Sequence, residues 1–328
     1  MFRTRFFTLV VILSLFLVTN GVFAMEHNKS KNSKTAIVVA SFGTTYPKAL
    51  KSILNVTDAI QKEFPNTEVR LAFTSNIIRK IWHERKSDPK WTSRKDIPKQ
   101  LFSIKGPLAT IADLQDEGFK NIIVQSTHFY AGEEFMDLLA YINGLNSIKT
   151  IKAKYRPFNK LVVGRPLTGQ WGDQRDYKED IVALAKALKK DVELAKQKRA
   201  ALVYMGHGNE FFSTGIYVQL QDVMRKMYKT TKIFIGTVEG YPSFENVLEG
   251  LKHTKTKKVV LKPLMLVAGD HANNDMAGDE ESSWKSILEK NKIHVYPVLE
   301  GLGENQKVVK IIVEHVKEAA QDNHIKLK

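Results

Sequence analysis

Short apolar runs alternate with amphipathic segments along most of the chain. Nearly continuous apolar runs are typical of strands buried on both faces, and apolar residues at helical spacing are typical of helices that cover a sheet. This alternation predicts parallel strand–helix–strand units. The expected strands of the first half are Thr35–Ser41, Glu68–Thr74, Asn121–Ser126 and Leu161–Val163, and the expected helices are Ala49–Phe64, Asn76–Trp82, Leu101–Glu117 and Glu133–Asn143.

The second half repeats this plan and ends in one more helix. Within the first half, after Asn76–Trp82, the polar, basic stretch His83–Asp96 predicts a surface excursion, in which Trp82 and Trp91 mark a contact surface or anchor the excursion to the core. The expected strands of the second half are Ala200–Met205, Lys232–Ile235, Lys258–Val267 and His294–Leu299, and the expected helices are Tyr177–Lys198, Ile216–Met227, Phe244–Leu251, Ser282–Lys290 and Val308–Gln321.

The two halves also resemble each other in their letters. Ala36–Gly43 aligns with Ala201–Gly208, and His128–Glu134 aligns with Met265–His271. Similar halves predict two flavodoxin/Rossmann-like α/β domains whose parallel sheets face a central cleft. We expect an N-terminal domain at residues 35–168, a C-terminal domain carrying the metal site at residues 169–302, and a C-terminal helix at residues 303–328 that packs back on the N-terminal domain.

The first residues have the pattern of a secretory signal. Arg3 and Arg5 precede the apolar run Phe6–Val18, and Val22-Phe23-Ala24 is a small-residue cleavage signal. We expect residues 1–24 to be a signal peptide followed by a polar stub at residues 25–34, which places the mature protein in the periplasm or otherwise outside the cytoplasm. The alternative is an uncleaved membrane anchor, because the apolar stretch approaches spanning length.

Composition narrows the chemistry. The chain has no cysteine, so a metal site here must use His, Asp and Glu, which suit borderline divalent ions. A net charge of +15 favours an acidic partner. The basic stretches lack the aromatic interleaving of a nucleic-acid groove, which argues against nucleic acid. The turn Ser41–Thr45 lacks the spacing of a phosphate-binding loop, so we expect no nucleotide.

Two histidines occupy similar places after predicted strands. His207 lies between Gly206 and Gly208, and His271 lies in Ala268–Asp275, a polar segment in which we expect no helix. Residues at the carboxyl ends of parallel strands share one edge of the sheet, where ligands bind. The pair therefore indicates a metal site or an acid–base pair, with Asp270 or Asp275 fixing the His271 tautomer. The alternatives are a histidine that caps a turn and a polar loop that caps a helix.

Carboxylates follow neighbouring strands. Glu239 comes directly after Lys232–Ile235, and two histidines with one carboxylate can hold a divalent metal with open positions. In the first half, Glu134 matches His271 in the aligned repeat and follows His128 and Glu133. Acidic residues at a helix N-terminus also stabilise the helix dipole, and a lone loop glutamate is usually solvated.

The chain is similar, at these residues, to the anaerobic cobalt chelatase family (sirohydrochlorin cobaltochelatase) of the class II chelatases related to ferrochelatase. The resemblance implies a tetrapyrrole between two α/β domains and a divalent metal substrate held by His207, His271 and Glu239, with Glu134 as a further acidic residue near the cleft. The matching segments are Val39–Thr44, Ala72–Ser75, Gln125–His128, Gly132–Glu134, Met205–Gly208, Val238–Pro242, Pro263–Met276 and Gly301–Asn305.

The resemblance predicts an ATP-independent insertion of Co²⁺, or of Fe²⁺ or Ni²⁺, into sirohydrochlorin. In this hypothesis His207 and His271 first hold the ion and then accept the pyrrole protons, which Glu134 helps to carry away. Lysines at the cleft rim would meet the acid groups of this polycarboxylate tetrapyrrole. The signal sequence departs from a biosynthetic enzyme and leaves a second reading, an exported carrier of metal or haem. The oligomeric state stays open, including a homo-oligomer.

Overall fold

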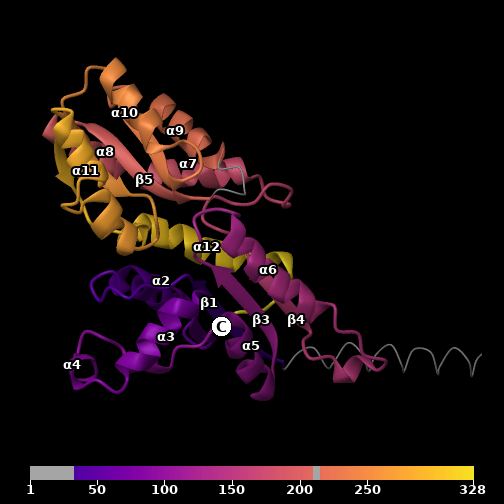
Figure 1. Cartoon of the computed structure of the whole chain (residues 1–328). Helices are drawn as coiled ribbons and strands as arrows, with labels where there is room; N and C mark the ends of the chain where they lie inside the picture. The colour runs from indigo at the N-terminus through magenta and orange to yellow at the C-terminus, as the bar shows by residue number, and fades with distance from the viewer. Residues whose placement is uncertain (1–32, 210–214) are drawn as a thin grey trace, which may run out of the picture.

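The structure is a computed structural model that describes residues 33–209 and 215–328. It forms two α/β lobes, one above the other in Figure 1. The predicted signal peptide and most of the polar stub lie outside the described residues. Across residues 33–209 and 215–328, every helix is too short or too polar to cross a bilayer.

The N-terminal sheet has four parallel strands in the order β2-β1-β3-β4. Its middle strands are buried because they consist of apolar residues that face helices on both sides, so Ala36–Ala40 of β1 have no exposed surface. The strands are β1 (Lys34–Ser41), β2 (Glu68–Phe73), β3 (Phe119–Ser126) and β4 (Lys160–Gly164).

The C-terminal sheet has the same plan, with four parallel strands in the order β6-β5-β7-β8. In this topology β5 takes the place of β1, and β7 takes the place of β3, as the aligned segments predict. The α/β fold class with two facing parallel sheets is confirmed. The strands are β5 (Ala201–Gly208), β6 (Ile233–Glu239), β7 (Lys258–Pro263) and β8 (His294–Pro297).

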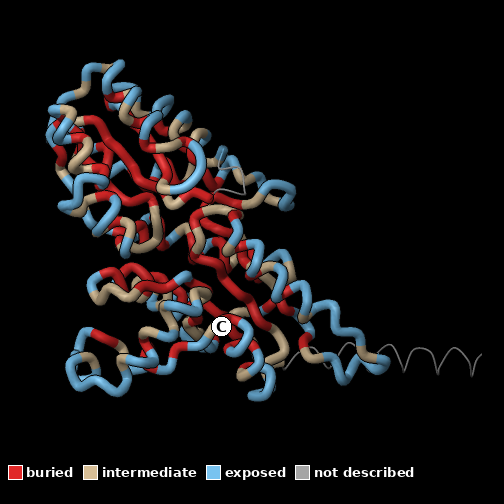
Figure 2. Tube along the Cα trace, viewed as in Figure 1, coloured by how far each residue is buried: buried red, intermediate tan, exposed pale blue. Residues whose placement is uncertain are grey.

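Helices cover both faces of each sheet, and the last helix joins the two lobes. Figure 2 shows the buried strands enclosed by helices whose outer faces are exposed. The helices are α2 (Leu50–Glu63), α3 (Asn76–Arg85), α4 (Pro89–Thr92), α5 (Pro107–Asp116), α6 (Glu133–Asn146), α7 (Tyr177–Ala187), α8 (Lys189–Lys198), α9 (Gly215–Met227), α10 (Phe244–His253), α11 (Trp284–Lys290) and α12 (Gln306–Asp322), with short 3₁₀ turns η2 (Lys99–Ser103), η3 (Ala153–Tyr155) and η5 (Leu302–Glu304).

One hydrophobic core continues through both lobes. Val308, Ile312 and Val316 of α12 pack in the same cluster as Val39 of β1 and Leu202 of β5. Helix α12 contacts α2, β3 and β4 of the N-terminal lobe and α7 of the C-terminal lobe. Because the lobes share buried apolar side chains, they are held together by packing as well as by the crossover between β4 and α7.

Two predicted helices are each divided in the structure. The expected helix Leu101–Glu117 is wrong, because Ile104–Gly106 are extended or non-helical and α5 begins at Pro107. Proline lacks an amide proton and disfavours a helical residue before it. The expected helix Tyr177–Lys198 breaks into α7 and α8 at Leu188, where ψ is 3°. Leu188 stays buried, so the apolar spacing runs through the break and hides it.

The stretch His83–Asp96, predicted as a surface excursion, contains helical structure. Helix α3 continues to Arg85, and α4 follows within the stretch. Trp82 is fully buried, and its ring meets Trp91 edge to face at 6.2 Å between centroids. The Arg85 guanidinium lies 3.8 Å from the Trp91 ring centroid. These contacts favour an anchoring role for both tryptophans over a free contact surface.

Candidate functional site

The first histidine is placed by the end of strand β5 and its two glycines. A Cβ on Gly206 would lie 2.3 Å from the Tyr217 ring, and one on Gly208, where φ is +79°, would lie 1.8 Å from the Glu239 carbonyl oxygen. Only glycine fits at both positions. The close approach is therefore to protein atoms of α9 and β6, and it leaves the His207 ring at the edge of the sheet.

The second histidine is placed by a helical segment that follows β7. Strand β7 ends at Pro263, earlier than the predicted Val267, because proline cannot donate to the sheet. The expectation that His271 lies in a segment without a helix is wrong: Asp270 and His271 are helical and Ala272–Met276 form a π-helical turn. Ala272 and Met276 are fully buried, so this turn is fixed by packing of its apolar face.

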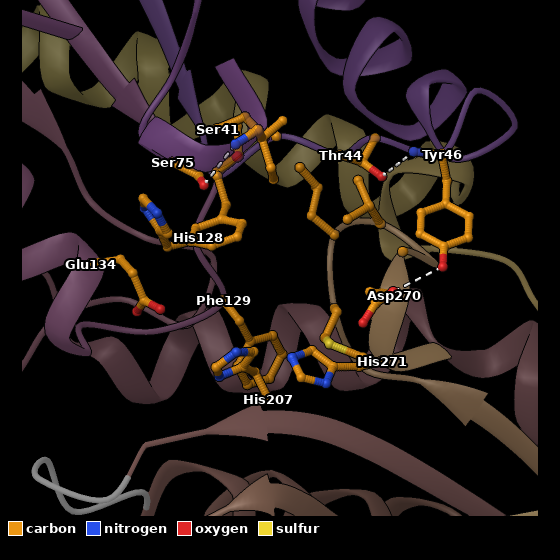
Figure 3. Close-up of a pocket in the computed structure, with 18 of the residues that line it drawn as sticks. Ser41, Thr44, Tyr46, Ser75, His128, Phe129, Glu134, His207, Asp270 and His271 are labelled. Carbon is orange, nitrogen blue, oxygen red and sulfur yellow. Dashed lines mark hydrogen bonds between the residues drawn. The ribbon is translucent and has the colours of Figure 1, made fainter. Parts of the chain in front are cut away.

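The two imidazoles meet in a cavity of about 400 Å³ between the lobes (Figure 3). Their ring centroids are 5.0 Å apart and the ring planes are at 83°. Residues from both lobes line the cavity, including Ser41, Thr44 and Glu134 on the N-terminal side. The sequence predictions that the histidines converge, and that Glu134 faces the same cleft, agree with this geometry.

Hydrogen bonds assign the ring nitrogens. The Nδ1 of His207 is 2.9 Å from the Gly208 carbonyl oxygen, which can only accept. The Nδ1 of His271 is 2.6 Å from Oδ2 of Asp275. Each Nδ1–H therefore donates, and in the neutral ring Nε2 keeps its lone pair. The predicted role of a nearby aspartate at His271 belongs to Asp275. Among the residues that the structure describes, neither Nε2 has a hydrogen-bond partner, so each can bind a metal ion or a proton.

Carboxylates surround a tyrosine beside the histidines. Burial, with the nearby charges of Glu134, Glu239 and Glu133, raises the pKa of the Tyr130 hydroxyl well above its usual value. The ring lines the cavity, and within residues 33–209 and 215–328 the buried hydroxyl has no hydrogen-bond partner. A neutral phenol at this place can donate a hydrogen bond to an acceptor in the cavity.

Glu239 is not assembled with the histidines. It is exposed at the end of β6, opposite Gly208 in the strand register, and it lies outside the cavity lining. Throughout the described part of the chain, no three His, Asp or Glu side chains are arranged to hold a metal ion. The structure thus brings together two members of the predicted ligand set, and leaves the third one strand away.

His128 also lines the cavity, as a neutral side chain. Burial lowers its pKa to about 4. Its Nδ1 is 2.8 Å from Oγ of Ser126, and its buried Nε2 has no partner among the described residues. The position carries a histidine whose charged form is disfavoured by desolvation, so it is suited to hydrogen bonding at neutral pH.

Tyr46 is a residue of the site that the sequence patterns do not predict. Its hydroxyl donates to Oδ1 of Asp270 at 2.8 Å, across the two lobes, and the Asn274 side-chain amide donates to the same oxygen at 2.9 Å (Figure 3). The hydrogen bond to Asp270 raises the pKa of Tyr46. The only signal in the sequence was its place just after the strand-end turn Ser41–Thr45, in the first lobe's counterpart of the His207 loop.

The cavity lining contains no lysine or arginine among the residues that the structure describes. Its polar side chains carry hydroxyls, three imidazoles and the two carboxylates Glu134 and Asp270. The rest of the lining is mostly apolar, including Phe129, Leu264 and Val267. The predicted lysines are therefore not in the cavity itself, and any acid group of a ligand must point out of it to reach them.

This architecture has a counterpart among solved structures. SirB from Bacillus subtilis with Fe³⁺ has a TM-score of 0.54 at 12% identity, covering 90% of this chain and all of that one. SirB from Bacillus subtilis subspecies spizizenii in complex with cobalt gives the same values. The two α/β domains of this chain thus belong to the fold class that these two structures show.

The particular family follows from sequence. The cobalt chelatase (CbiK) family model matches residues 35–321. The sirohydrochlorin cobaltochelatase of Salmonella typhimurium is 31% identical over 288 residues, covering 87% of this chain and 96% of that protein. Sirohydrochlorin cobaltochelatase CbiKC of Nitratidesulfovibrio vulgaris is 29% identical over 286 residues, with 87% and 90% covered. The chain belongs to the cobalt chelatase (CbiK) family, a class of lyases that insert metal, and the predicted resemblance is confirmed.

Proposed function

We propose that the protein inserts Co²⁺ into sirohydrochlorin without a nucleotide, with His207 and His271 as the central groups. The observation that carries this proposal is the pair of imidazoles with free Nε2 atoms in one interlobe cavity. The family and the substrates named for its relatives supply the metal and the tetrapyrrole. Fe²⁺ and Ni²⁺ are competing ions, because imidazole and carboxylate ligands bind all three.

Metal insertion exchanges one divalent ion for two pyrrole protons, so the site must bind a cation and accept protons. The Nε2 atoms of His207 and His271 can bind Co²⁺ as it arrives. Once the ion has passed to the pyrrole nitrogens, the same lone pairs are free to take up the two protons. Glu134, on the cavity wall, provides a carboxylate that passes protons to solvent.

Glu239 is proposed as the third metal ligand. Glu239 pairs in the strand register with Gly208, the residue after His207. Gly240, the residue after Glu239, has φ of +81°. A rotation of the exposed Glu239 side chain and a small shift of this glycine-flanked strand end would bring its carboxylate toward the imidazoles. Two imidazoles and one carboxylate leave positions open for the incoming pyrrole nitrogens.

The cavity lining suits the flat face of a macrocycle better than its acid groups. Apolar side chains such as Leu264 and Val267 can pack on the ring, while hydroxyls such as Ser41 and Thr44 can donate to one or two carboxylates. The remaining acid groups would point outward, toward the basic surface that a net charge of +15 provides.

The decisive experiment measures Co²⁺ insertion into sirohydrochlorin by absorption spectroscopy. His207→Ala and His271→Ala should each lower kcat/KM at least about a hundredfold, which is the size expected for loss of a metal ligand or proton acceptor. His253→Ala is the matched control, because His253 is exposed at the end of α10, outside the cavity. Its activity should equal that of the wild type.

A wild-type insertion rate no higher than that of the His207→Ala/His271→Ala double variant would exclude the proposed enzymatic function. Tight haem binding that survives both substitutions, without insertion, would instead support the exported carrier. Comparing Co²⁺, Fe²⁺ and Ni²⁺ in the same assay identifies the preferred ion.

We also propose that the protein is exported through a cleavable signal peptide, on the pattern of Arg3, Arg5 and Val22–Ala24. Mass spectrometry of the protein purified from fractionated cells should give a mature chain that begins at Met25, in the fraction outside the cytoplasm. An intact chain beginning at Met1 in the cytosolic fraction would contradict export.

A further inference from the structure

Apolar side chains project from the far edge of the N-terminal lobe. They lie in residues 148–160, here termed the basic apolar segment, which runs from the end of α6 through η3 to β4. Ile151 is fully exposed, and Ile148 and Tyr155 are 48% and 64% exposed. Figure 2 shows this segment as an exposed projection at one end of the N-terminal lobe. Three large apolar side chains together on one projection are more than the scattered exposure usual for a surface.

Cations surround these apolar side chains. Lys149, Lys152, Lys154 and Arg156 are all exposed, and the Nζ of Lys154 lies 4.8 Å from the centroid of the Tyr155 ring. No Asp or Glu occurs between Asp137 and Asp173 in the sequence, so the segment's own stretch of chain offers these cations no acidic partner. Aliphatic, aromatic and basic side chains in one exposed segment are the combination that binds an anionic lipid surface.

The base of the segment is fixed to the lobe. Phe158 is buried in the core beside β3, and the Nζ of Lys120 donates to the carbonyl oxygens of Arg156 and Pro157, at 3.3 and 3.0 Å. The exposed side chains are therefore presented by an anchored loop. Such a loop can bind a surface without first becoming ordered.

The chain enters the structure beside this segment. The side-chain amide of Asn159 donates to Oγ of Ser33 at 2.9 Å. The apolar run Phe6–Val18 precedes Ser33 by fourteen residues, which span at most about 50 Å when extended. In the uncleaved chain this run would enter a bilayer, and the contact at Ser33 would then direct the basic apolar segment toward the lipid. In the mature chain, which begins at Met25, the segment's own apolar and basic side chains provide the contact.

We propose that the basic apolar segment is a docking surface for an anionic phospholipid bilayer, with Ile148, Ile151 and Tyr155 entering the interface and the lysines and Arg156 meeting lipid phosphates. The segment projects from the end of the N-terminal lobe that lies away from the C-terminal lobe (Figure 1), so this orientation turns the C-terminal lobe away from the bilayer.

The absence of cysteine makes a direct test simple. The full chain carrying Ile151→Cys is labelled with a polarity-sensitive fluorophore and mixed with phosphatidylcholine vesicles, with or without phosphatidylglycerol. We expect a blue shift only with phosphatidylglycerol. Lys290→Cys is the control, since Lys290 is exposed on α11 of the other lobe, and its label should not shift. The shift at Ile151 must persist in the chain that begins at Met25, because the apolar run Phe6–Val18 attaches beside the segment and would bring Ile151, but not Lys290, to the bilayer.

Adding Lys149→Glu, Lys152→Glu and Lys154→Glu to the labelled Ile151→Cys chain should raise the vesicle concentration needed for the shift at least about a hundredfold, because each lost cation near an anionic surface removes about a fivefold factor. No shift with phosphatidylglycerol, or an equal shift with both vesicles, would overturn the proposal. A shift that follows protein concentration without vesicles would also overturn it, and would identify a second copy of the chain as the partner.

Discussion

His207 and His271 have the same proton arrangement although their neighbours differ. One Nδ1–H donates to a backbone carbonyl and the other to the Asp275 carboxylate. Each acceptor fixes the orientation of its ring and places the proton on Nδ1 of the neutral imidazole.

His128 gives a pH prediction at this scale. Burial lowers its pKa to about 4, from 6.5. Between these two pKa values the imidazole is protonated in the unfolded chain but neutral in the folded chain. The contribution of His128 to stability is therefore present above about pH 6.5 and is lost as the pH falls toward 4. Denaturant titration should show that the free energy of unfolding falls by about 2 kcal/mol more in the wild type than in His128→Asn when the pH is lowered from 7 to 5. Equal losses would show that His128 is protonated freely in the folded protein.

At the scale of elements, the turn that carries His271 contacts the opposite lobe. Asp270 begins this turn and accepts hydrogen bonds from Tyr46, in the loop after β1, and from Asn274. This contact ties the N-terminal lobe to the element that positions His271. Tyr46 is partly buried and Asp270 is exposed, so the bond contributes at most about 1 kcal/mol and fixes position more than stability.

Tyr46→Phe removes only this hydroxyl. We expect a loss of less than about 1 kcal/mol in the free energy of unfolding, but faster hydrogen exchange of the amides in residues 270–276, because the turn loses its contact with the other lobe. Tyr141→Phe, an exposed tyrosine on the outside of α6, is the control and should leave this exchange unchanged. Unchanged exchange in Tyr46→Phe would mean that packing of Ala272 and Met276 alone fixes the turn.

For the whole molecule, a buried ionic cluster joins the lobes where the chain crosses between them. Arg165, after β4, pairs with Asp180 of α7 and Glu318 of α12, and His315 of α12 also contacts Asp180 at 3.0 Å. The cluster connects three segments distant in sequence. Removing one member leaves buried charge without compensation, which costs more than the pair itself contributes.

Arg165→Ala should therefore lower the free energy of unfolding by about 3–5 kcal/mol. Arg70→Ala is the matched control: Arg70 pairs with Glu117 through two nitrogens, but at the surface, where such pairs contribute less than about 1 kcal/mol. Denaturant titration compares them, and equal losses would show that the crossover cluster is as solvated as the surface pair.

Local patterns in the sequence predict the alternation of strands and helices and the two similar halves, because burial on both faces of a strand and helical spacing are properties of short segments. They place His207, His271 and Glu134 correctly at one cleft, since the carboxyl ends of parallel strands share an edge. They fail where apolar spacing continues through a break, as at Leu188, and where proline or packing redirects the chain, as between Pro263 and Met276.

Only the tertiary structure decided which groups meet across the lobes. The Tyr46–Asp270 hydrogen bond, the carboxylates around Tyr130, and the distance of Glu239 from the imidazole pair depend on how two sheets and α12 pack together. These contacts join residues far apart in sequence, so no local pattern encodes them. The residue types alone indicate the chemistry of the site, but the interface between the lobes determines which of these groups lie together.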